Sequence, residues 1–359
     1  MINEEVLKRL IKAYLCEENN LSLDINDKDL FKLANALNVS SIIAYTLKKL
    51  NIKSDLFDTS IYKAISNYER LDYVRNNIIK VFNDNNIEYL LLKGSSISKY
   101  YVEPYLRYSA DIDIIVKQDH YDKAYNLMIN NLEFKCVQNA IHEKTLTNKQ
   151  GVSVDFHNNF LLDKPEFEDV FINCFNDKHE LDDNYNYLFH LVHGAMHLVR
   201  GQMELRYFTD LFYLRKHINT DITCKVVDRL HLSKFEEAVN SYLDSLLGLK
   251  EYSDQDRELD AFIFNYAKDA GASNRVLNNS DNKASYFIHH IFPSFNIMKG
   301  KYPILKNWPI LLPIMYVIRL FRVLFSNRRK YALNELKEGL NGDKTSNIIN
   351  NLGLDVYQG

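Results

Sequence analysis

The spacing of hydrophobic and polar residues changes twice along the chain. In residues 1–85, apolar positions such as Val6 and Leu10 recur at the spacing of a helix. In residues 86–183, short apolar runs of strand length are separated by turn residues, and in residues 184–359 the helical spacing returns. The pattern therefore predicts three regions with these boundaries, in which a small α/β unit lies between two helical ones.

The middle region carries the strand signals. We predict strands at 87–92, 110–116, 133–137, 142–147 and 152–156. One long helix is expected before them over 58–83, Asp119 is expected to cap a shorter helix, and Lys149-Gln-Gly151 is expected to form a tight turn. Further helices are predicted at 187–198, 204–217, 223–230, 235–247 and 254–266, with a loop at 278–282. The predicted fold class is α+β, with a small mixed β-sheet core flanked by N-terminal and C-terminal helical regions.

Composition and charge exclude several classes of protein. Of the 359 residues, 46% are hydrophobic and 25% are charged, which is typical of a globular chain and excludes disorder for most of it. The 44 Lys and Arg residues nearly balance the 47 Asp and Glu residues, for a net charge of −3. This balance gives no strong signal for binding duplex nucleic acid, although a local basic groove stays possible.

Cysteine spacing and the terminal residues favour a cytoplasmic protein. The four cysteines form no C-x-x-C pair, which argues against a zinc ribbon and against a disulfide framework. Met1-Ile-Asn-Glu-Glu5 places acidic residues where a secretory signal needs a basic region. The most apolar window, 309–318, is shorter than the roughly 20 residues of a membrane span. We therefore expect a soluble chain in a reducing compartment.

The second predicted strand carries two acidic residues on one face. Side chains alternate across a strand, so Asp111 and Asp113 point to one side while Ile112 and Ile114 point to the other. The apolar pair can be buried, but the two carboxylates repel each other unless a cation compensates them. Oxygen ligands of this kind suit Mg²⁺ or Mn²⁺, so the pair is a candidate metal site.

The last predicted strand supplies a third acid by the same alternation. Asp155 and His157 share one face of that strand. Three acids on adjacent strands are suited to hold two Mg²⁺ ions, as in-line phosphoryl chemistry requires. The turn at Gly94-Ser95 supplies the matching half, because its backbone N–H groups can bind the phosphates of an NTP and glycine permits close approach.

These motifs together resemble a known group of enzymes. The motifs are Leu92-Lys-Gly-Ser95, Arg107-x-Ser-x-Asp-Ile-Asp113 and Val154-Asp-Phe-His157. They are similar to the nucleotidyltransferases of the DNA-polymerase-β-like superfamily. With Phe208-Thr-Asp-Leu211 after a His-rich segment, the chain looks more narrowly like a bacterial group of uncharacterised nucleotidyltransferases. The resemblance implies that Asp111, Asp113 and Asp155 are catalytic metal ligands.

Three further residues of these motifs are candidates for the nucleotide side of the site. Lys93 can neutralise a triphosphate or can extend past a strand end as an ordinary surface lysine. Arg107 can bind phosphate in a bidentate manner or pair with Asp111 or Asp113. His157 can orient an acceptor, act as a base or be a hydrogen-bonded structural residue. These alternatives stay open at the level of sequence.

Two features outside the motifs have a competing structural interpretation. His190, His193 and His197 fall on one helical face, but they lack a metal-site motif, so core packing is favoured over a metal site. Residues 299–330 combine basic and apolar side chains, for which packing of helices is favoured over weak contact with an anionic membrane surface or nucleic acid.

The sequence therefore predicts an Mg²⁺-dependent nucleotidyltransferase. It would transfer NMP from an NTP to a hydroxyl or phosphate of a small-molecule or peptide-linked acceptor and release pyrophosphate. The alternatives are a toxin-like enzyme acting on tRNA or protein, and a catalytically silent nucleotide-binding regulatory protein. We expect the acceptor to enter between the α/β unit and the helices that follow it, where Arg200, Arg206, His197 and Asp210 are candidate contacts.

Overall fold

The computed structural model separates the chain into two units. One contains Met1–Gly194 and Glu204–Tyr252, and the other contains Ala195–Met203 and Ser253–Gly359. The boundaries at 85 and 183 stay predictions. The structure describes residues 2–21, 23, 25–139, 143–160, 169–269, 274, 292, 295, 298–299, 302–324 and 348–357.

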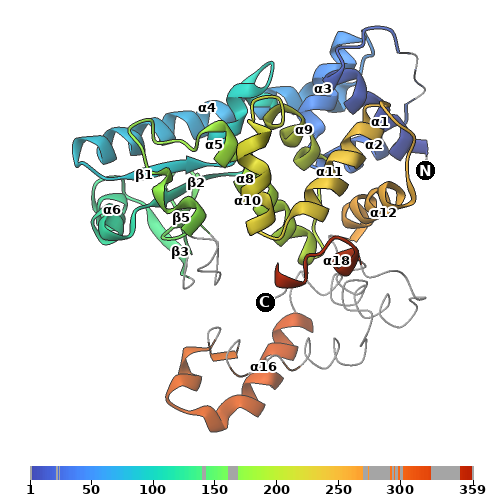
Figure 1. Ribbon diagram of the computed structural model, residues 1–359. Helices are drawn as coiled ribbons and strands as arrows, with labels where there is room; N and C mark the ends of the chain where they lie inside the picture. The colour runs from blue at the N-terminus through green and yellow to red at the C-terminus, as the bar shows by residue number, and fades with distance from the viewer. Residues whose placement is uncertain are drawn as a thin grey trace. The chain divides into compact units, whose positions relative to one another are not determined.

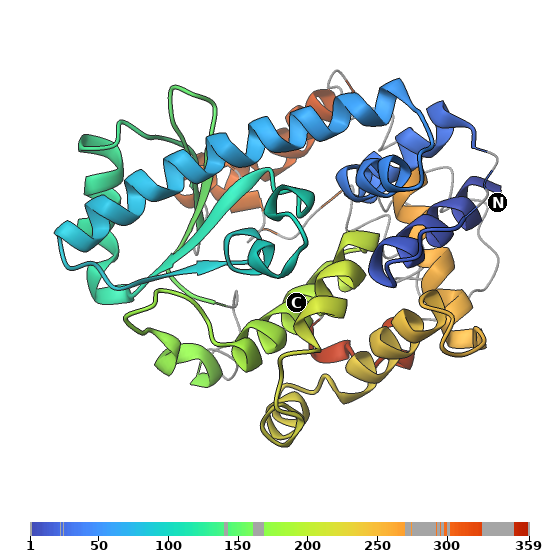
Figure 2. The ribbon, with the colours of Figure 1, turned by 90° about the horizontal axis from the view of Figure 1, so that it is seen from above.

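Four helices precede the sheet. They are α1 (Ile2–Leu15), α2 (Asp27–Ala36), α3 (Ser40–Lys49) and α4 (Asp55–Asp84). The Ser54 hydroxyl accepts the backbone N–H of Phe57 and so caps α4 at its N-terminus. The second half of α4 buries Val74, Ile78 and Phe82 in the same core as the sheet, and Figure 2 shows the helix running along it. The long helix predicted over 58–83 is confirmed and extends slightly further at both ends.

The sheet is small and mixed. Its strands are β1 (Tyr89–Leu92), β2 (Asp111–Val116), β3 (Lys135–Asn139), β4 (Glu143–Thr147) and β5 (Ser153–His157). The strand order is β1-β2-β5-β4-β3, and β2 and β5 are parallel while the other neighbours are antiparallel (Figure 1). The α+β class predicted from the sequence is therefore confirmed.

Short helical segments connect the strands. Between β1 and β2 lie α5 (Gly94–Ile97), η1 (Ser98–Tyr100) and η2 (Pro104–Leu106). After β2, η3 (Gln118–His120) leads into α6 (Tyr121–Asn130). The predicted cap at Asp119 is wrong, because the 3-10 turn moves the cap position to His120, which makes no side-chain capping bond. The predicted turn at Lys149–Gly151 is present, and Gly151 has the positive φ of +74° that such a turn requires.

Helices dominate the rest of the described chain. They are α8 (Asp183–Val199), α9 (Leu205–Leu214), α10 (Thr220–Arg229), α11 (Ser233–Leu246), α12 (Asp254–Asp269), α16 (Leu312–Leu324) and α18 (Ile348–Asn351). Short 3-10 segments are η4 (Ile172–Cys174), η6 (Pro303–Lys306), η7 (Pro309–Leu311) and η8 (Asp355–Tyr357). Each predicted helix of this region is present, with ends shifted by a few residues. His142 and the predicted loop at 278–282 lie outside the described residues.

None of the described helices combines sufficient length with sufficient apolar character to cross a bilayer.

A close crossing of α8 and α9 depends on a glycine. A Cβ atom built on Gly194 would lie 2.2 Å from Cε2 of Tyr207, whose ring is buried. The same ring stacks on His190 with centroids 4.2 Å apart, so it cannot move aside without disturbing a second contact. Gly194 is thus the residue that lets the two helices approach.

We expect Gly194→Ala to lower the free energy of unfolding by about 1–3 kcal/mol, because an added methyl group in a filled core forces side chains off their preferred rotamers. Chemical denaturation followed by circular dichroism measures the change. Ser66→Ala, which changes an exposed position of α4, is the control and should alter stability by less than about 0.5 kcal/mol. Equal stability of the two variants would contradict the role of Gly194.

Candidate active site

The parallel pairing of β2 and β5 brings the three predicted acids together. In this register Asp113 lies opposite Asp155, and Asp111 lies opposite Ser153. The intervening residues of both strands, Ile112 and Val154 among them, belong to the buried core beneath the sheet. Asp111, Asp113 and Asp155 therefore lie on one face, as the alternation of side chains predicts.

The three carboxylates destabilise one another's charge. Burial raises the pKa of Asp111, and the neighbouring Asp113 and Asp155 raise it further, to about 6. Burial, Asp113 and Glu143 likewise raise the pKa of Asp155. The hydroxyl of Thr145 donates a hydrogen bond of 3.1 Å to Asp155 Oδ1. A site with this excess of negative charge favours a cation.

Lys93 provides that cation for the innermost acid. Its Nζ lies 2.7 Å from Oδ1 of Asp113, whose side chain is only 3% exposed. Burial alone would raise the pKa of Asp113, but Lys93 and His157 lower it far below its ordinary value. Burial would lower the pKa of Lys93, but Asp113, with Asp111 and Asp155, raises it. The ion pair was not among the interpretations of Lys93 that the sequence suggested.

The backbone of Lys93 is strained. It has φ +49° and ψ −116°, a conformation that residues with a Cβ rarely adopt. Such a conformation costs roughly 1–3 kcal/mol and is found mainly at functional sites. The strain lies between β1 and α5, directly after Leu92, which is paired with Asp113 across the sheet. The unusual turn thus sets the lysine beside its partner acid.

The turn after Lys93 packs tightly against the residues that precede β2. A Cβ on Gly94 would lie 2.7 Å from Nη1 of Arg107 and 2.7 Å from Oγ of Ser109. The carbonyl of Lys93 accepts the N–H groups of Ser96 and Ile97, at 3.1 and 2.9 Å. The N–H groups of Gly94 and Ser95 therefore precede the first backbone hydrogen bond of this turn.

Arg107 is buried in an ion pair with α9. Its Nη2 lies 2.9 Å from Oδ2 of Asp210, and its Nε donates to Oδ1 at 3.3 Å. The Tyr101 hydroxyl donates to the same Oδ1 at 2.6 Å. The sequence had suggested phosphate or the acids of β2 as partners of Arg107, and the structure shows Asp210 instead. The carboxylate of Asp210 is 2% exposed, so it does not line a cleft as expected.

We call the face of the sheet that carries Asp111, Asp113 and Asp155 the acidic face. His157 lies at its edge. Its Nε2 lies 3.4 Å from Oδ1 of Asp113, and its Nδ1 lies 3.8 Å from Oε2 of Glu143. Glu143 is opposite His157 in the pairing of β4 with β5, and sequence analysis did not single it out. The imidazole therefore bridges two carboxylates within the polar cluster.

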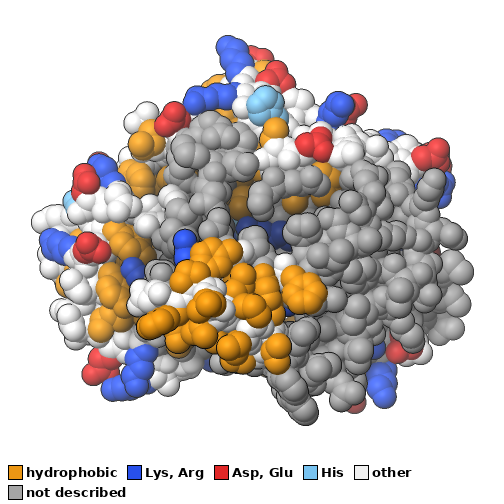
Figure 3. All heavy atoms as spheres, turned by 90° about the horizontal axis from the view of Figure 1, so that it is seen from below, with side chains coloured by type: hydrophobic (Ala, Val, Ile, Leu, Met, Phe, Trp, Pro, Cys, Tyr) orange, Lys and Arg blue, Asp and Glu red, His pale blue; other side chains and the backbone are white. Residues whose placement is uncertain are grey.

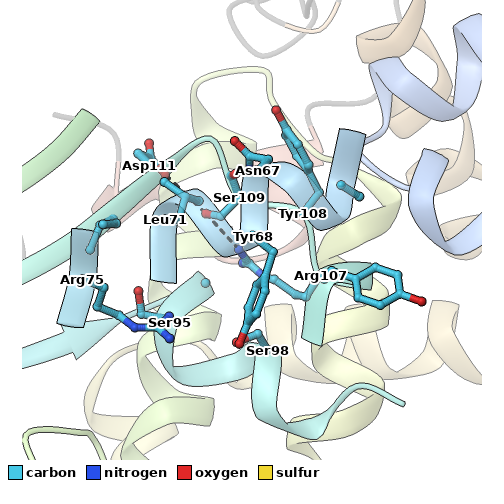
Figure 4. Close-up of a pocket in the computed structure, with 14 residues that line it drawn as sticks. Asn67, Tyr68, Leu71, Arg75, Ser95, Ser98, Arg107, Tyr108, Ser109 and Asp111 are labelled. Carbon is cyan, nitrogen blue, oxygen red and sulfur yellow. Dashed lines mark hydrogen bonds between the residues drawn. The ribbon is translucent and has the colours of Figure 1, made fainter. Parts of the chain in front are cut away.

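A pocket lies between α4 and the turn after Lys93, with Asp111 in its wall (Figure 4). Figure 4 shows the side chain of Arg75 extending toward Ser95. Arg75 also pairs with Asp72 of its own helix. The pocket is lined by Ala64, Asn67, Tyr68, Leu71, Arg75, Gly94, Ser95, Ser98, Tyr105, Arg107, Tyr108, Ser109, Asp111 and Ile112.

The wall formed by α4 was missed in the sequence. Residues 64, 68, 71 and 75 follow one another at three- and four-residue steps, so they form one stripe along the helix. Arg75 stands in a stripe that is otherwise apolar or aromatic, and that position was the available signal. Asn67, beside the stripe, donates a hydrogen bond of 2.7 Å to the carbonyl of Ser109 and so joins the helix to the strand entry.

The donor set suits a hard divalent cation chemically. Carboxylate oxygens are the preferred ligands of Mg²⁺ and Mn²⁺. Their present arrangement, with Lys93 on Asp113, does not amount to a metal centre: within the described ranges no three or more His, Cys, Asp or Glu side chains are placed to hold an ion. Asp111, Asp113 and Asp155 therefore offer the donor atoms that such a cation prefers and share one face, but in their present placement they do not form a metal centre.

The predicted acceptor contacts fall in different units. Arg206 belongs to the same unit as the acids; its charge lowers the pKa of Asp111, and its Nη1 donates to the carbonyl of Tyr108 at 2.8 Å. Arg200 and His197 belong to the other unit, where His197 Nδ1 is 2.8 Å from Oε1 of Gln202. The predicted cleft between the α/β unit and the later helices stays a prediction.

His190 has the core role that the sequence favoured for the histidine face. Its Nε2 lies 3.0 Å from the carbonyl of Tyr207 on α9. His193 stacks on Phe189 with centroids 6.3 Å apart. Burial, with smaller contributions from Arg107 and Arg206, lowers the pKa of His190 to about 4 despite the opposing effect of Asp210.

The class of this protein is given by a family match that agrees with its fold and site. A small mixed sheet carries Asp-x-Asp on one strand and a third acid on the parallel neighbour, and Gly94 and Ser95 line the pocket beside Asp111. The sequence model of the uncharacterised nucleotidyltransferase family matches residues 24–248, and the chain belongs to this family. The matched range includes every candidate residue of the acidic face, and the predicted resemblance to this family is confirmed. No curated protein matches the chain.

The buried histidine predicts a pH dependence of stability. The pKa of His190 is lower in the folded state than its ordinary value of 6.5, so the unfolded chain binds the proton first. The contribution of neutral His190 to the free energy of unfolding is complete above pH 6.5 and is lost as the pH falls towards 4. At pH 5 we expect a loss of roughly 2 kcal/mol, which denaturant titrations at several pH values measure. His190→Gln should show a smaller loss over this range, and an unchanged pH profile would contradict the assignment.

Proposed function

We propose that this protein transfers NMP from an NTP to a hydroxyl or phosphate of an acceptor, with Mg²⁺ or Mn²⁺ as cofactor. The observation that carries the proposal is the common face of Asp111, Asp113 and Asp155 in a chain of the nucleotidyltransferase family. In this reaction the acceptor oxygen bonds to the α-phosphorus, the bond to the β-phosphate oxygen breaks, and pyrophosphate leaves with the proton released to the site or to solvent. A small-molecule or peptide-linked acceptor is the proposed substrate class.

The three carboxylates are the proposed ligands of the metal. A divalent cation bound to them would lower the pKa of the acceptor hydroxyl and neutralise charge on the triphosphate. Asp155 would favour loss of the acceptor proton, because its carboxylate adds negative charge beside the acids of β2. His157, held near Asp113 and Glu143, would orient the acceptor.

Lys93 is proposed to change partners when substrate binds. The raised pKa keeps its ammonium group charged, and its Nζ now neutralises Asp113. Positive charge brought in by the cofactor would weaken this pair, and the lysine would then be available to the triphosphate next to Gly94 and Ser95. The lysine would move only a short distance in this exchange, because the strained turn already sets it between the acids and the Gly-Ser turn.

The polar residues around the pocket beside Asp111 are the proposed contacts of the triphosphate tail. They include the hydroxyls of Ser95 and Ser109 and the guanidinium of Arg75, and arginine binds phosphate with paired hydrogen bonds. Gly94 keeps the turn within reach of this pocket, because a side chain there would meet Arg107 and Ser109. Arg107 itself is already paired with Asp210, so it would act by holding the turn in place.

A catalytically silent nucleotide-binding protein is the competing function. It is favoured by one observation, namely that the ammonium group of Lys93 neutralises Asp113, one of the three acids that the metal would need. A toxin-like enzyme would share the site and differ in its acceptor. Metal-dependent turnover separates the first alternative from the proposal, and comparison of tRNA, protein and small-molecule acceptors separates the second.

We expect pyrophosphate release from NTPs with Mg²⁺ or Mn²⁺ to fall by at least about 100-fold in Asp111→Asn and in Asp113→Asn. The acidic face then has fewer ligands for the cofactor, and loss of a main electrostatic contribution typically has this size. Labelled NTPs with a panel of acceptors provide the measurement.

The matched control for these variants is Asp122→Asn, an exposed acid of α6 on the same α/β unit. It should retain full activity. Turnover of Asp111→Asn equal to that of the control would refute the metal assignment, and nucleotide binding without metal or turnover would support the silent protein.

We further expect Arg75→Gln to raise the KM for NTP by about tenfold, since a hydrogen bond to a charged group contributes on the order of 1.5–3 kcal/mol. Binding of the matching NMP, which lacks the tail, should change little. Lys63→Gln removes the same charge from an exposed position of α4 and is the control. Equal weakening of NTP and NMP binding would show that Arg75 does not contact the triphosphate tail.

A further inference from the structure

The near-neutral charge of the chain hides a basic segment. Residues 282–334 contain no Asp or Glu among 53 residues, but they contain nine Lys and Arg. The rest of the chain holds the other 35 basic residues and all 47 acidic ones, so it carries a net charge of −12. The nine basic residues are Lys283, Lys299, Lys301, Lys306, Arg319, Arg322, Arg328, Arg329 and Lys330.

The described part of this segment exposes large apolar side chains. Trp308 is 62% exposed and Ile310 is 82% exposed. Figure 3 shows hydrophobic side chains gathered in one continuous patch. We call the following exposed residues the apolar face: Ile304, Trp308, Ile310, Ile314, Val317 and Ile318. Soluble proteins rarely expose a group of this kind unless it contacts something.

The apolar face is separate from the residues that pack the segment internally. Leu311, Leu312, Met315 and Tyr316 pack on a small core around Met298, Tyr302 and Leu305. In α16, Ile314, Val317 and Ile318 follow the i, i+3, i+4 spacing of one helical face, while Leu312 and Met315 belong to the face that packs. The internal core therefore does not account for the exposed stripe.

We propose that residues 302–324 dock on an anionic lipid surface through the apolar face. An interfacial helix combines aliphatic and Trp side chains on one face with a surplus of Lys and Arg around it, and this segment has both. The aliphatic residues would enter the boundary between headgroups and acyl chains, and Trp308 would lie at the level of the headgroups. This inference does not depend on the proposed nucleotidyl transfer.

Charge and composition favour lipid over other occupants. A second copy of the same segment would bring together two segments that each carry nine basic and no acidic residues, which opposes association. Binding of nucleic acid would explain the basic residues but would not explain why Ile310, Ile314 and Val317 are exposed. Sites for proteins are typically rich in Tyr and Arg at their centre, whereas this face is mostly isoleucine and valine.

Trp308 is the only tryptophan of the chain, so its fluorescence reports on this face directly. We expect a blue shift of its emission, and co-sedimentation of the full chain, with vesicles of phosphatidylcholine and phosphatidylglycerol. Vesicles of phosphatidylcholine alone should bind less, and high salt should weaken binding to the anionic vesicles. The double variant Ile310→Glu, Ile314→Glu should lower the affinity at least about tenfold, because it removes buried apolar area and adds repelled charge.

Leu249→Glu is the matched control, because it adds an acid at a 71% exposed leucine outside the segment. It should bind vesicles as the parent chain does. Turnover of a soluble acceptor should be the same in all variants, so failure of lipid binding and failure of nucleotidyl transfer are distinguishable. Equal vesicle binding by the double variant and the control would overturn the proposal. So would binding of RNA or self-association in the absence of any response to anionic vesicles.

Discussion

Repulsion among three carboxylates on one face of the sheet is the constraint on which the rest of the site depends. Pairing of β2 with β5 places Asp113 opposite Asp155, and burial of Asp113 limits the screening of its charge by water. Without compensation this charge would oppose folding of the two central strands. The chain supplies one compensating cation, Lys93, and brings it there through a backbone conformation that itself costs free energy. The strained turn is therefore a consequence of the charge pattern on β2 and β5.

A second ion pair holds that turn in place. Arg107 follows the turn and pairs with Asp210 of α9, while its Nη1 lies 2.7 Å from the position that a Cβ of Gly94 would take. Removing either partner would leave a buried charge uncompensated, which typically costs 3–5 kcal/mol. The helix α9 is therefore part of the support of the acidic face, although it contributes no residue to that face. The family match, from residue 24 to residue 248, includes both partners of this ion pair.

Local patterns were sufficient to predict the elements and the acids. Alternation along a strand placed Asp111 and Asp113 on one face, and helical spacing located α4 and the later helices. The partners could not be predicted in the same way. The pairing of Lys93 with Asp113 depends on a positive φ at a lysine, and that of Arg107 with Asp210 joins residues 103 positions apart. The stripe of α4 that ends at Arg75 has the spacing of an ordinary packing face, and only the folded chain places the turn beside it.

The net charge does not predict which ligands this chain attracts, because its charges are segregated both within the site and along the sequence. Over a few ångströms, Lys93 neutralises one acid while Asp111 and Asp155 keep raised pKa values, so the local demand for a cation is only partly met. Along the sequence, an acid-free stretch at 282–334 offsets an otherwise acidic chain. The net charge of −3 reveals neither of these two charge patterns. Each region attracts ligands of opposite sign, since electrostatic forces decay within about 10 Å in salt and respond to the nearest charges rather than to their sum. The net charge therefore predicts the ligand of neither the acidic face nor the basic segment.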